Sequence, residues 1–369
     1  MAAPKSTVWA LDPHTRAKHE ILRLYLEAWA PILSLGGFTT IAYVDGFSGP
    51  GIYARGENGS PVIALNVALQ HDKNMKGKVL FLFIEKEQDR AEKLREIVAG
   101  MSLPTRFHVK IAGGKTFEEG FRENLLDFYR KKSRPLPPTF AFIDPFGWKG
   151  VPFDLIKTIL QSPSCEVLVN FMFEEINRFI GHPDQEGNFD ALFGTADWRQ
   201  MLNIVEPKKR HDFLHDLYLR QLRFAAGAKY VRSFEMRNDK DVTDYFLFFA
   251  TNNTKGMAKM KAAMWKVDQG GEFRFSDATN LSQAVLFSPK PDYASLRKAI
   301  VQRFGGHETT VGDVEEYVLA ETPFRETHYK KQVLAELERE SPPKLVPIGA
   351  HPRRRSGTFS DPNMRIRFP

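Results

Sequence analysis

The sequence predicts an α/β fold: a mostly parallel, Rossmann-like sheet with an antiparallel hairpin at one edge, followed by a C-terminal winged helix-turn-helix. Two observations predict the sheet. Short apolar runs alternate with segments of helical periodicity, which is typical of parallel strands with helices on both faces. A glycine-rich turn directly follows the first apolar run, at the place where ligands bind in such sheets. We expect a large domain over 1–290 and a small one over 291–369.

The elements of the larger domain follow from apolar periodicity and from capping residues. A first helix over 13–33 begins after Asp12, which can cap it, and ends at Gly36-Gly37. Further helices are expected at 60–70, 88–98, 117–131, 153–160 and 255–266. Strands are expected at 41–44, 78–84, 107–111, 140–143 and 166–171, and the edge hairpin at 230–236 and 245–251.

Two segments of this domain show no clear period. Residues 177–215 are expected to be irregular, with Phe179, Phe193 and Trp198 covering the sheet or forming a lid. An acidic and aromatic loop is expected over Glu272–Phe275.

Three of the predicted strands end in an acidic residue, namely Asp45, Glu85 and Asp144. The carboxyl ends of parallel strands meet at one edge of a sheet, so these acids would line a common crevice. In the loop that follows Asp45, the glycines at 46, 49 and 51 let the backbone approach a ligand closely, because no Cβ is in the way. One acid alone would more often cap the next helix, but three in succession favour a pocket.

The loop chemistry narrows the class of ligand. The loop does not match the Gly-x-Gly-x-x-Gly pattern of dinucleotide sites, and it lacks the Gly-Lys-Ser/Thr of a phosphate loop. A ligand with a ribose and an amino-acid moiety suits the acids better: Glu85 could accept hydrogen bonds from the ribose hydroxyls, and Asp45 could hold an ammonium group. S-adenosylmethionine has both features, and its sulfonium centre needs no catalytic metal.

The stretch Asp144-Pro145-Phe146-Gly147-Trp148 forms the second half of the predicted site. A carboxylate at a strand end can accept a hydrogen bond from the exocyclic amine of a base, and Phe146 or Trp148 offers a stacking face. The alternative is a turn whose aromatic side chains pack on the next helix.

The C-terminal segment has the plan of a winged helix-turn-helix. Helices are expected at 293–304, 310–320 and 326–340, and two short strands at 344–347 and 363–368 would form the wing. Basic side chains of this segment could contact a phosphate backbone. The candidates are Lys330, Lys331, Arg353, Arg354 and Arg355, together with His328, Arg365 and Arg367. Binding of a protein by this domain is the alternative.

Composition adds broader limits. The formal net charge of +7 permits nucleic-acid binding without proving it, because many basic proteins only carry solvated lysines. A single cysteine, Cys165, excludes an internal disulfide and any cysteine-held cluster made by this chain alone. No apolar run reaches about 18 residues, and the N-terminus lacks the apolar core of a signal peptide. We therefore expect a cytoplasmic protein with no membrane partner.

Motifs along nearly the whole chain carry a resemblance to a known family. They are Val44–Gly51 (VDGFSGPG), Gly59-Ser60-Pro61, Phe83–Lys86 (FIEK), Ile143–Pro152 (IDPFGWKGVP), Asn170-Phe171-Met172, Ile176–Phe179 (INRF) and, in the tail, Val314–Val318 through Tyr329–Lys331. The chain resembles the three-Cys-motif partner proteins (TcmP), whose bodies are similar to S-adenosylmethionine-dependent methyltransferases. The Asp-Pro-Phe-Gly-Trp string is the most specific part of this resemblance.

This resemblance implies a Rossmann-like methyltransferase domain, a winged-helix domain, S-adenosylmethionine as cofactor, and a separate partner protein with three cysteines that looks like a radical, iron–sulfur-type enzyme. By analogy with methyltransferases, the methionine end of the cofactor would contact Asp45, Phe47, Gly49 and Gly51, and its ribose would contact Glu85.

The catalytic assignment rests on the same analogy. Asp144 corresponds to the acid of the Asp-Pro-Pro-aromatic motif of amino-nitrogen methyltransferases, and Phe146 replaces the second proline. Asp144 would orient an acceptor amine, and Phe146 or Trp148 would stack on its base.

Three hypotheses follow. The first is an S-adenosylmethionine-dependent methyltransferase that acts on nucleic acid, DNA in particular. The second is a non-catalytic adaptor that recognises nucleic acid and delivers it to the three-cysteine partner, for example in DNA repair. The third and weakest is a nuclease that uses Asp45, Glu85 and Asp144 to hold a metal ion.

Overall fold

The computed structural model describes residues 6–268, 270–276, 291–349 and 353–369, and the chain divides into two compact units. The first unit comprises Met1–Ala263 and Arg274–Leu281, and the second comprises Met264–Phe273 and Ser282–Pro369. The domain boundary expected at Pro289-Lys290-Pro291 falls largely outside the described residues.

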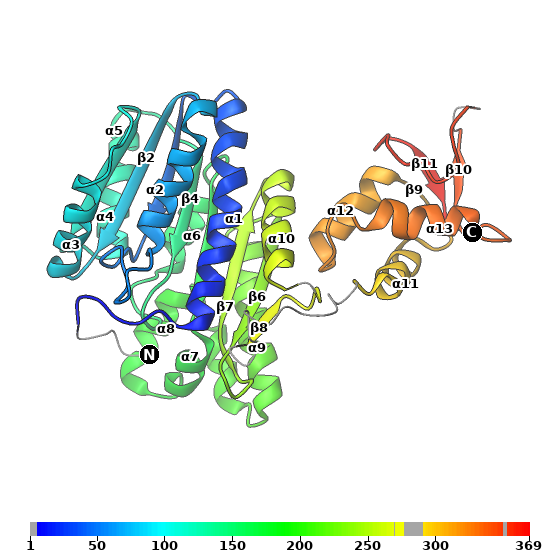
Figure 1. The fold of residues 1–369 in the computed structure, drawn as a ribbon. Helices are drawn as coiled ribbons and strands as arrows, with labels where there is room; N and C mark the ends of the chain where they lie inside the picture. The colour runs from blue at the N-terminus through cyan, green and yellow to red at the C-terminus, as the bar shows by residue number, and fades with distance from the viewer. Residues whose placement is uncertain (1–5, 269, 277–290, 350–352) are drawn as a thin grey trace. The chain divides into compact units, whose positions relative to one another are not determined.

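The first unit is built on one large sheet (Figure 1). Within the described part of the chain, eight strands pair in the order β3-β2-β1-β4-β5-β7-β6-β8. Their bounds are β1 (Thr40–Asp45), β2 (Lys78–Glu85), β3 (Phe107–Gly113), β4 (Thr139–Ile143), β5 (Glu166–Phe171), β6 (Tyr230–Arg237), β7 (Thr243–Thr251) and β8 (Arg274–Ser276). β1 to β5 run parallel, and β7 lies antiparallel to both β5 and β6. This is the predicted Rossmann-like methyltransferase sheet.

The edge of the sheet differs from the prediction. Arg274 and Phe275, expected in a loop, belong instead to β8 (Arg274–Ser276), which pairs with β6 in parallel. A strand of three residues is too short to show the alternation by which strands are recognised in a sequence.

The central strands are apolar throughout because helices cover both of their faces. Every residue of β4 and β5 is buried, as are all residues of β1 after Thr40. On one face, the ring of Tyr25 from α1 (Pro13–Leu35) lies 4.9 Å from Phe140 of β4 and 5.1 Å from Phe249 of β7. The Tyr25 hydroxyl also donates to the buried carboxylate of Glu166.

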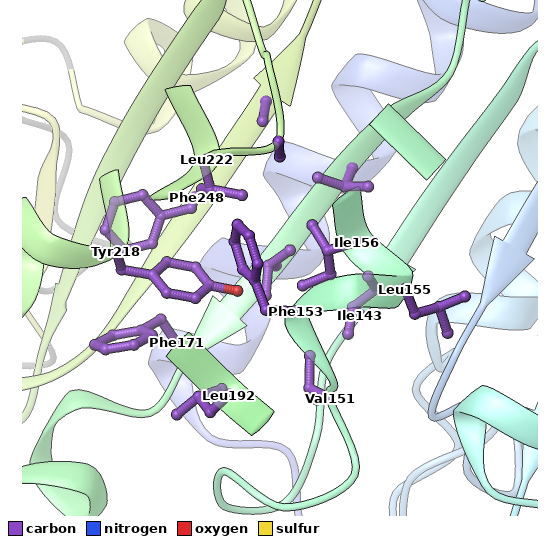
Figure 2. Close-up of a cluster of buried hydrophobic side chains, with 14 of the residues drawn as sticks. Ile143, Val151, Phe153, Leu155, Ile156, Phe171, Leu192, Tyr218, Leu222 and Phe248 are labelled. Atoms are coloured by element: carbon purple, nitrogen blue, oxygen red, sulfur yellow. The ribbon is translucent and has the colours of Figure 1, made fainter. Parts of the chain in front are cut away.

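The opposite face carries the main apolar core (Figure 2). Side chains from β5 and β7 interleave there with those of α6 (Phe153–Leu160), α8 (Glu186–Phe193) and α9 (Pro207–Arg220). The ring of Tyr218 on α9 lies 4.6 Å from Phe171 and 5.2 Å from Phe248.

Residues 177–215 are largely helical, so the prediction of an irregular segment is wrong. The helices α8 and α9 of this segment show only three buried positions each, too few for a clear helical period. Phe193 and Trp198 are fully buried and cover the sheet, as expected. The other helices of this unit are α2 (Ser60–His71), α3 (Gln88–Ala99), α4 (Phe117–Phe121), α5 (Asp127–Lys131) and α7 (Phe173–Phe179), with π-helical segments over Arg122–Leu126 and Gln221–Ala225. The helix α10 (Thr254–Val267) begins in this unit, and its residues from Met264 on belong to the second.

The second unit has the predicted winged helix-turn-helix plan. Its helices are α11 (Tyr293–Phe304), α12 (Val311–Glu321) and α13 (Ala335–Arg339), which continues a π-helical turn over Lys330–Leu334. The wing has three strands rather than the expected two, in the order β10 (Val346–Ile348), β11 (Arg365–Arg367), β9 (Glu308–Thr310). Over the described residues of both units, none of the helices is long and apolar enough to cross a membrane.

Gly51 gives a test of the local packing around the glycine loop. Gly51 and Gly56 both have positive φ, +79° and +89°. A Cβ on Gly51 would lie 2.6 Å from Cδ1 of the buried Leu94, whereas a Cβ on Gly56 would meet nothing within 4 Å. The backbone penalty is therefore shared, and we expect Gly51→Ala to lower the free energy of unfolding by about 1–3 kcal/mol more than Gly56→Ala. Urea unfolding of the two variants measures this difference, and equal losses would contradict the close packing.

Candidate functional site

The three acids that end predicted strands do meet at one edge of the sheet. β2, β1 and β4 are neighbours, so Glu85, Asp45 and Asp144 stand side by side at their carboxyl ends. Asp45 is fully buried and Glu85 is 7% exposed, while Asp144 is partly exposed. The three carboxyl groups therefore occupy different depths below the surface.

The glycines of the loop serve two purposes. A Cβ on Gly46 would lie 2.7 Å from the ring of Phe117, so Gly46 is required by packing, as Gly51 is. Gly49 is different: with φ of +59°, its N–H donates to Glu85 Oε2 at 2.8 Å, and a Cβ there would meet only the Trp9 ring, at 3.5 Å. Gly49 is thus the glycine whose bare backbone faces a space that a ligand could share.

A cavity of about 280 Å³ lies at this edge, close to the lower limit for small-molecule sites. Its walls come from the N-terminal half of α1, from residues 47–53 of the glycine loop, from Asp144–Phe146, and from Asn170 and Tyr245. Phe47, Gly49, Gly51, Asp144 and Phe146 of the predicted site are among its lining residues.

Asp45 and Glu85 lie behind this wall and not in it. Asp45 accepts hydrogen bonds from the Phe47 N–H at 3.3 Å and from the Tyr43 hydroxyl at 3.4 Å. Burial raises the pKa of Asp45 to about 7, against hydrogen bonds from Ser60 and Phe47 that lower it. Glu85 accepts from the N–H groups of Gly49 and Glu87, each at 2.8 Å, and burial raises its pKa. Both acids therefore support the wall through Ser60 and Gly49, which do line the cavity.

Asp144 is the predicted acid that faces the cavity. Lys18 Nζ lies 2.7 Å from its Oδ1 and 2.6 Å from its Oδ2, and Asn170 Nδ2 donates to Oδ1 at 2.6 Å. Lys18 and Asn170 are each only 5% exposed. A partly buried carboxylate thus has a cation and an amide as partners at the ends of β4 and β5.

The polar residues of α1 are part of the site that sequence reasoning missed. His14, Lys18 and His19 are buried and line the cavity. Burial, with a smaller contribution from Lys18, lowers the pKa of His19 to about 3, which leaves its imidazole neutral. A signal exists in the sequence, because Lys18 lies on the stripe that continues as Leu22 and Tyr25, where a solvated lysine is not expected.

The segment before α1 also contributes to the site. Trp9 packs edge-on against Phe146 at 5.2 Å and against Tyr53 at 5.8 Å between ring centroids. The Arg90 guanidinium lies 5.0 Å from the Trp9 ring and 5.8 Å from the Phe146 ring. Since Trp9 stands outside any periodic segment, nothing in the sequence pattern pointed to it.

The two aromatic residues of the Asp-Pro-Phe-Gly-Trp stretch separate. Phe146 is 40% exposed and lines the cavity. Trp148 is buried in the core, its ring stacked on Phe189 at 5.5 Å and 5.0 Å from Phe179, and it is absent from the cavity wall. The packing alternative therefore describes Trp148, and only Phe146 keeps a stacking face open to a ligand.

In the second unit, several predicted phosphate contacts already have acidic partners. Arg354, whose side chain is 11% exposed, pairs with Glu338, and Lys330 Nζ lies 3.2 Å from Glu315. Lys331, Arg353 and Arg355 are exposed. Arg365 and Arg367 both pair with Glu308 across the wing. Lys331 and Arg355, which are exposed, are thus the better candidates for contacts with an external anion.

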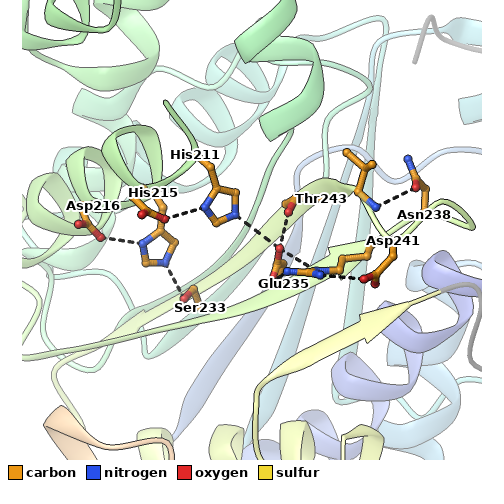
Figure 3. A network of polar contacts seen from close by, with 11 residues as sticks. His211, His215, Asp216, Ser233, Glu235, Asn238, Asp241 and Thr243 are labelled. Carbon is orange, nitrogen blue, oxygen red and sulfur yellow. Dashed lines mark hydrogen bonds and ion pairs between the residues drawn. The ribbon is translucent and has the colours of Figure 1, made fainter. Parts of the chain in front are cut away.

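A second polar cluster links α9 to the sheet (Figure 3). His215 lies 2.9 Å from Asp216 through Nδ1 and 2.9 Å from Ser233 through Nε2. His211 Nε2 lies 3.5 Å from Glu235. Burial would raise the pKa of Glu235, but hydrogen bonds, that of His211 largest among them, lower it to about 2. The cluster joins helix and strand mainly through His215 and Ser233, whereas His211 Nε2 lies near Glu235 without a well-formed hydrogen bond.

No group of three or more His, Cys, Asp or Glu residues is placed to hold a metal ion in the parts of the chain that the structure describes. We therefore base no proposal on the nuclease alternative.

The strand order, the antiparallel β7 and the glycine loop after β1 define a Rossmann-like methyltransferase fold with a C-terminal winged helix. A family model described as a GMT-like wHTH domain matches residues 274–342. None of the curated proteins matches the chain.

Among solved structures, the chain is similar to a Legionella pneumophila protein of the DUF519 family (12% identity, 63% of this chain and 85% of that chain, TM-score 0.37). It is also similar to an O-methyltransferase from Bacillus cereus in complex with SAH (14%, 65% and 84%, 0.35) and to human methyltransferase-like protein 13 in complex with SAH (15%, 73% and 97%, 0.32). Similarity at this level carries no inference about activity.

The buried carboxyl of Asp45 predicts a pH dependence of stability. Its folded pKa of about 7 lies above the ordinary value of 3.8, so the unfolded chain releases this proton first as the pH rises. The contribution of Asp45 to stability is present below about pH 4 and is lost towards pH 7. Asp45→Asn cannot titrate, so we expect its free energy of unfolding, relative to wild type, to increase across this window by at most about 4 kcal/mol. Urea unfolding at pH 4.5 and 7.5 checks this, and parallel pH profiles would contradict it.

Proposed function

We propose that this protein is an S-adenosylmethionine-dependent methyltransferase that acts on nucleic acid. The observation that carries the proposal is the cavity at the carboxyl ends of β1 and β4, with the glycine loop on one side and Asp144 on the other. In open α/β sheets this edge is the place where ligands bind.

The charges around the cavity suit the cofactor. Asp12 and Asp144 line it, Asp45 and Glu85 stand behind it, and Lys18 is the one lysine or arginine among its lining residues in the described chain. Two acids against one lysine in the wall favour a ligand with a sulfonium and an ammonium group. When bound, S-adenosylmethionine supplies an activated methyl group, and the residues of the chain bind the cofactor and orient an acceptor.

The roles of individual residues follow from their positions. Gly49 and Ser60 would contact the cofactor directly and transmit the support of Glu85 and Asp45, with the ribose on the side of Glu85. Phe146 would stack on the base that carries the acceptor, since its ring is exposed at the cavity. Both oxygens of Asp144 have partners, so a free acceptor for an amine is not available there in this form.

Nucleic acid is proposed as the substrate because of the second unit. A winged helix-turn-helix places one helix in a DNA groove. In this unit, Lys331 lies in the helical segment that continues as α13, and Arg353 and Arg355 follow β10. All three side chains are exposed. The net charge of +7 agrees with an anionic partner.

A non-catalytic adaptor is the second candidate, favoured by two observations. Asp144 is engaged by Lys18 and Asn170, and the Trp9 ring stands over Gly49. In this case the protein would recognise nucleic acid and deliver it to a separate three-cysteine, iron–sulfur-type partner. The single cysteine of this chain, Cys165, is buried and could not hold such a cluster.

The decisive experiment combines calorimetric titration of S-adenosylmethionine with transfer of a labelled methyl group to DNA and RNA. The methyltransferase proposal expects saturable binding and label in the nucleic acid, and it expects Phe146→Ala to reduce transfer while binding of the cofactor persists. Absence of cofactor binding by the folded protein would overturn the proposal. Cofactor or DNA binding without any transfer would favour the adaptor.

The wing offers a matched pair of arginines as a second test. We expect Arg354→Ala to destabilise the second unit by about 2 kcal/mol, because it leaves the half-buried Glu338 without its cation. Arg355→Ala removes an exposed charge, so stability should not change. For Arg355→Ala, we expect the affinity for DNA to fall. The slope of log affinity against log salt concentration should decrease in magnitude by about 1. Thermal unfolding and binding at two salt concentrations measure both effects, and an unchanged slope would argue against a phosphate contact.

A further inference from the structure

We propose that Lys18, Asp144 and Asn170 form a receptor for the α-amino-acid end of the ligand, with Lys18 binding the carboxylate and Asp144 and Asn170 binding the ammonium group. The inference rests on the proposed function and deepens it, because it assigns the methionine end of the cofactor to residues that α1, β4 and β5 bring together.

This wall of the cavity carries both charges that an α-amino acid needs. Lys18 is a cation, Asp144 an anion, and both line the cavity with Asn170. Lys18 Nζ contacts both oxygens of Asp144 at 2.7 and 2.6 Å, and it has three N–H donors for this contact and for others. An α-amino acid presents the complementary pair, one ammonium and one carboxylate, on a single carbon atom.

Asn170 has a buried acceptor atom that lacks a donor. Asn170 donates through Nδ2 to Asp144 at 2.6 Å, but its Oδ1 is buried and has no hydrogen-bond partner among the described residues. A buried carbonyl oxygen without a donor is costly, and such groups in native proteins call for an explanation. A ligand ammonium held by Asp144 would supply the missing donor to this residue.

A zwitterionic ligand can replace the Lys18–Asp144 ion pair at little cost in free energy. Opening a buried ion pair is expensive when it leaves either charge without a partner. A zwitterion avoids this penalty, because Lys18 would exchange one carboxylate for another and Asp144 would exchange one ammonium for another. In the ligand-free protein the ion pair therefore holds Lys18 and Asp144 in position. On binding, the ligand carboxylate would replace Asp144 at Lys18, and the ligand ammonium would replace Lys18 at Asp144.

The assignment also moves the ammonium site away from Asp45. Asp45 is fully buried, is absent from the cavity wall, and already accepts from Phe47 and Tyr43. A ligand group in the cavity reaches Asp144 without passing another residue, whereas Ser60 separates it from Asp45. It follows that Asp144 serves the cofactor, and the acceptor is oriented by other groups.

The test compares two probes that differ only at the amino-acid end. S-adenosylhomocysteine carries it, and 5′-methylthioadenosine retains the nucleoside and the thioether without it. We expect Lys18→Met to reduce the affinity for S-adenosylhomocysteine by about tenfold or more in calorimetric titration. This is the loss typical of a hydrogen bond to a charged group. Binding of 5′-methylthioadenosine should change less than about twofold. Lys149→Met is the matched control, since Lys149 is exposed and absent from the cavity wall, and it should bind both probes as wild type does.

Loss of folding is controlled by the double variant Lys18→Met/Asp144→Asn, which removes both charges and leaves no unpaired ion. It should bind 5′-methylthioadenosine normally and S-adenosylhomocysteine no better than the single variant. If Lys18→Met binds S-adenosylhomocysteine like wild type, or if a variant loses both probes together, the receptor assignment is overturned while the proposed function stands. If the folded wild-type protein binds neither probe, the proposed function fails and the assignment fails with it.

Discussion

The ion pair between Lys18 and Asp144 is the interaction on which the rest of the site depends. It joins α1 to the end of β4, and Asn170 extends it to the end of β5. The buried lysine and the partly buried carboxylate are tolerated because each is the counter-charge of the other and because an amide adds a hydrogen bond. Without the lysine, Asp144 would lose its counter-charge and keep the Asn170 amide, and a partly buried charge without a counter-ion is costly.

Depth separates the roles of the other two acids. Asp45 and Glu85 sit one layer below the cavity, where burial raises the pKa of each, and they accept hydrogen bonds from the loop that forms the wall. They hold the glycine loop in its conformation, and Gly49 and Ser60, which contact them, line the cavity. In the second unit, too, charged residues of one kind differ in their surroundings. Arg354 is largely buried in an ion pair with Glu338, whereas Arg355 is exposed.

Much of the fold was predictable because strong local patterns coincide with it. The apolar runs at β1, β2, β4 and β5 are continuous since both faces of those strands are buried, and acids mark the carboxyl ends of β1, β2 and β4. The helices over 177–215 were not predictable because α8 and α9 bury only three residues each, and the three-residue strand β8 is too short to show alternation.

The sequence by itself determined the sheet, the winged helix, and the chemistry at the ends of three strands, because these depend on spacing along the chain. Only the tertiary structure decided which groups face the cavity. It buried Asp45 and Trp148, left Phe146 exposed, and brought Lys18 from a helix 126 residues away into contact with Asp144. The physical reason is that exposure and ion pairing depend on what packs against a residue from other elements, and local periodicity contains no information about those partners.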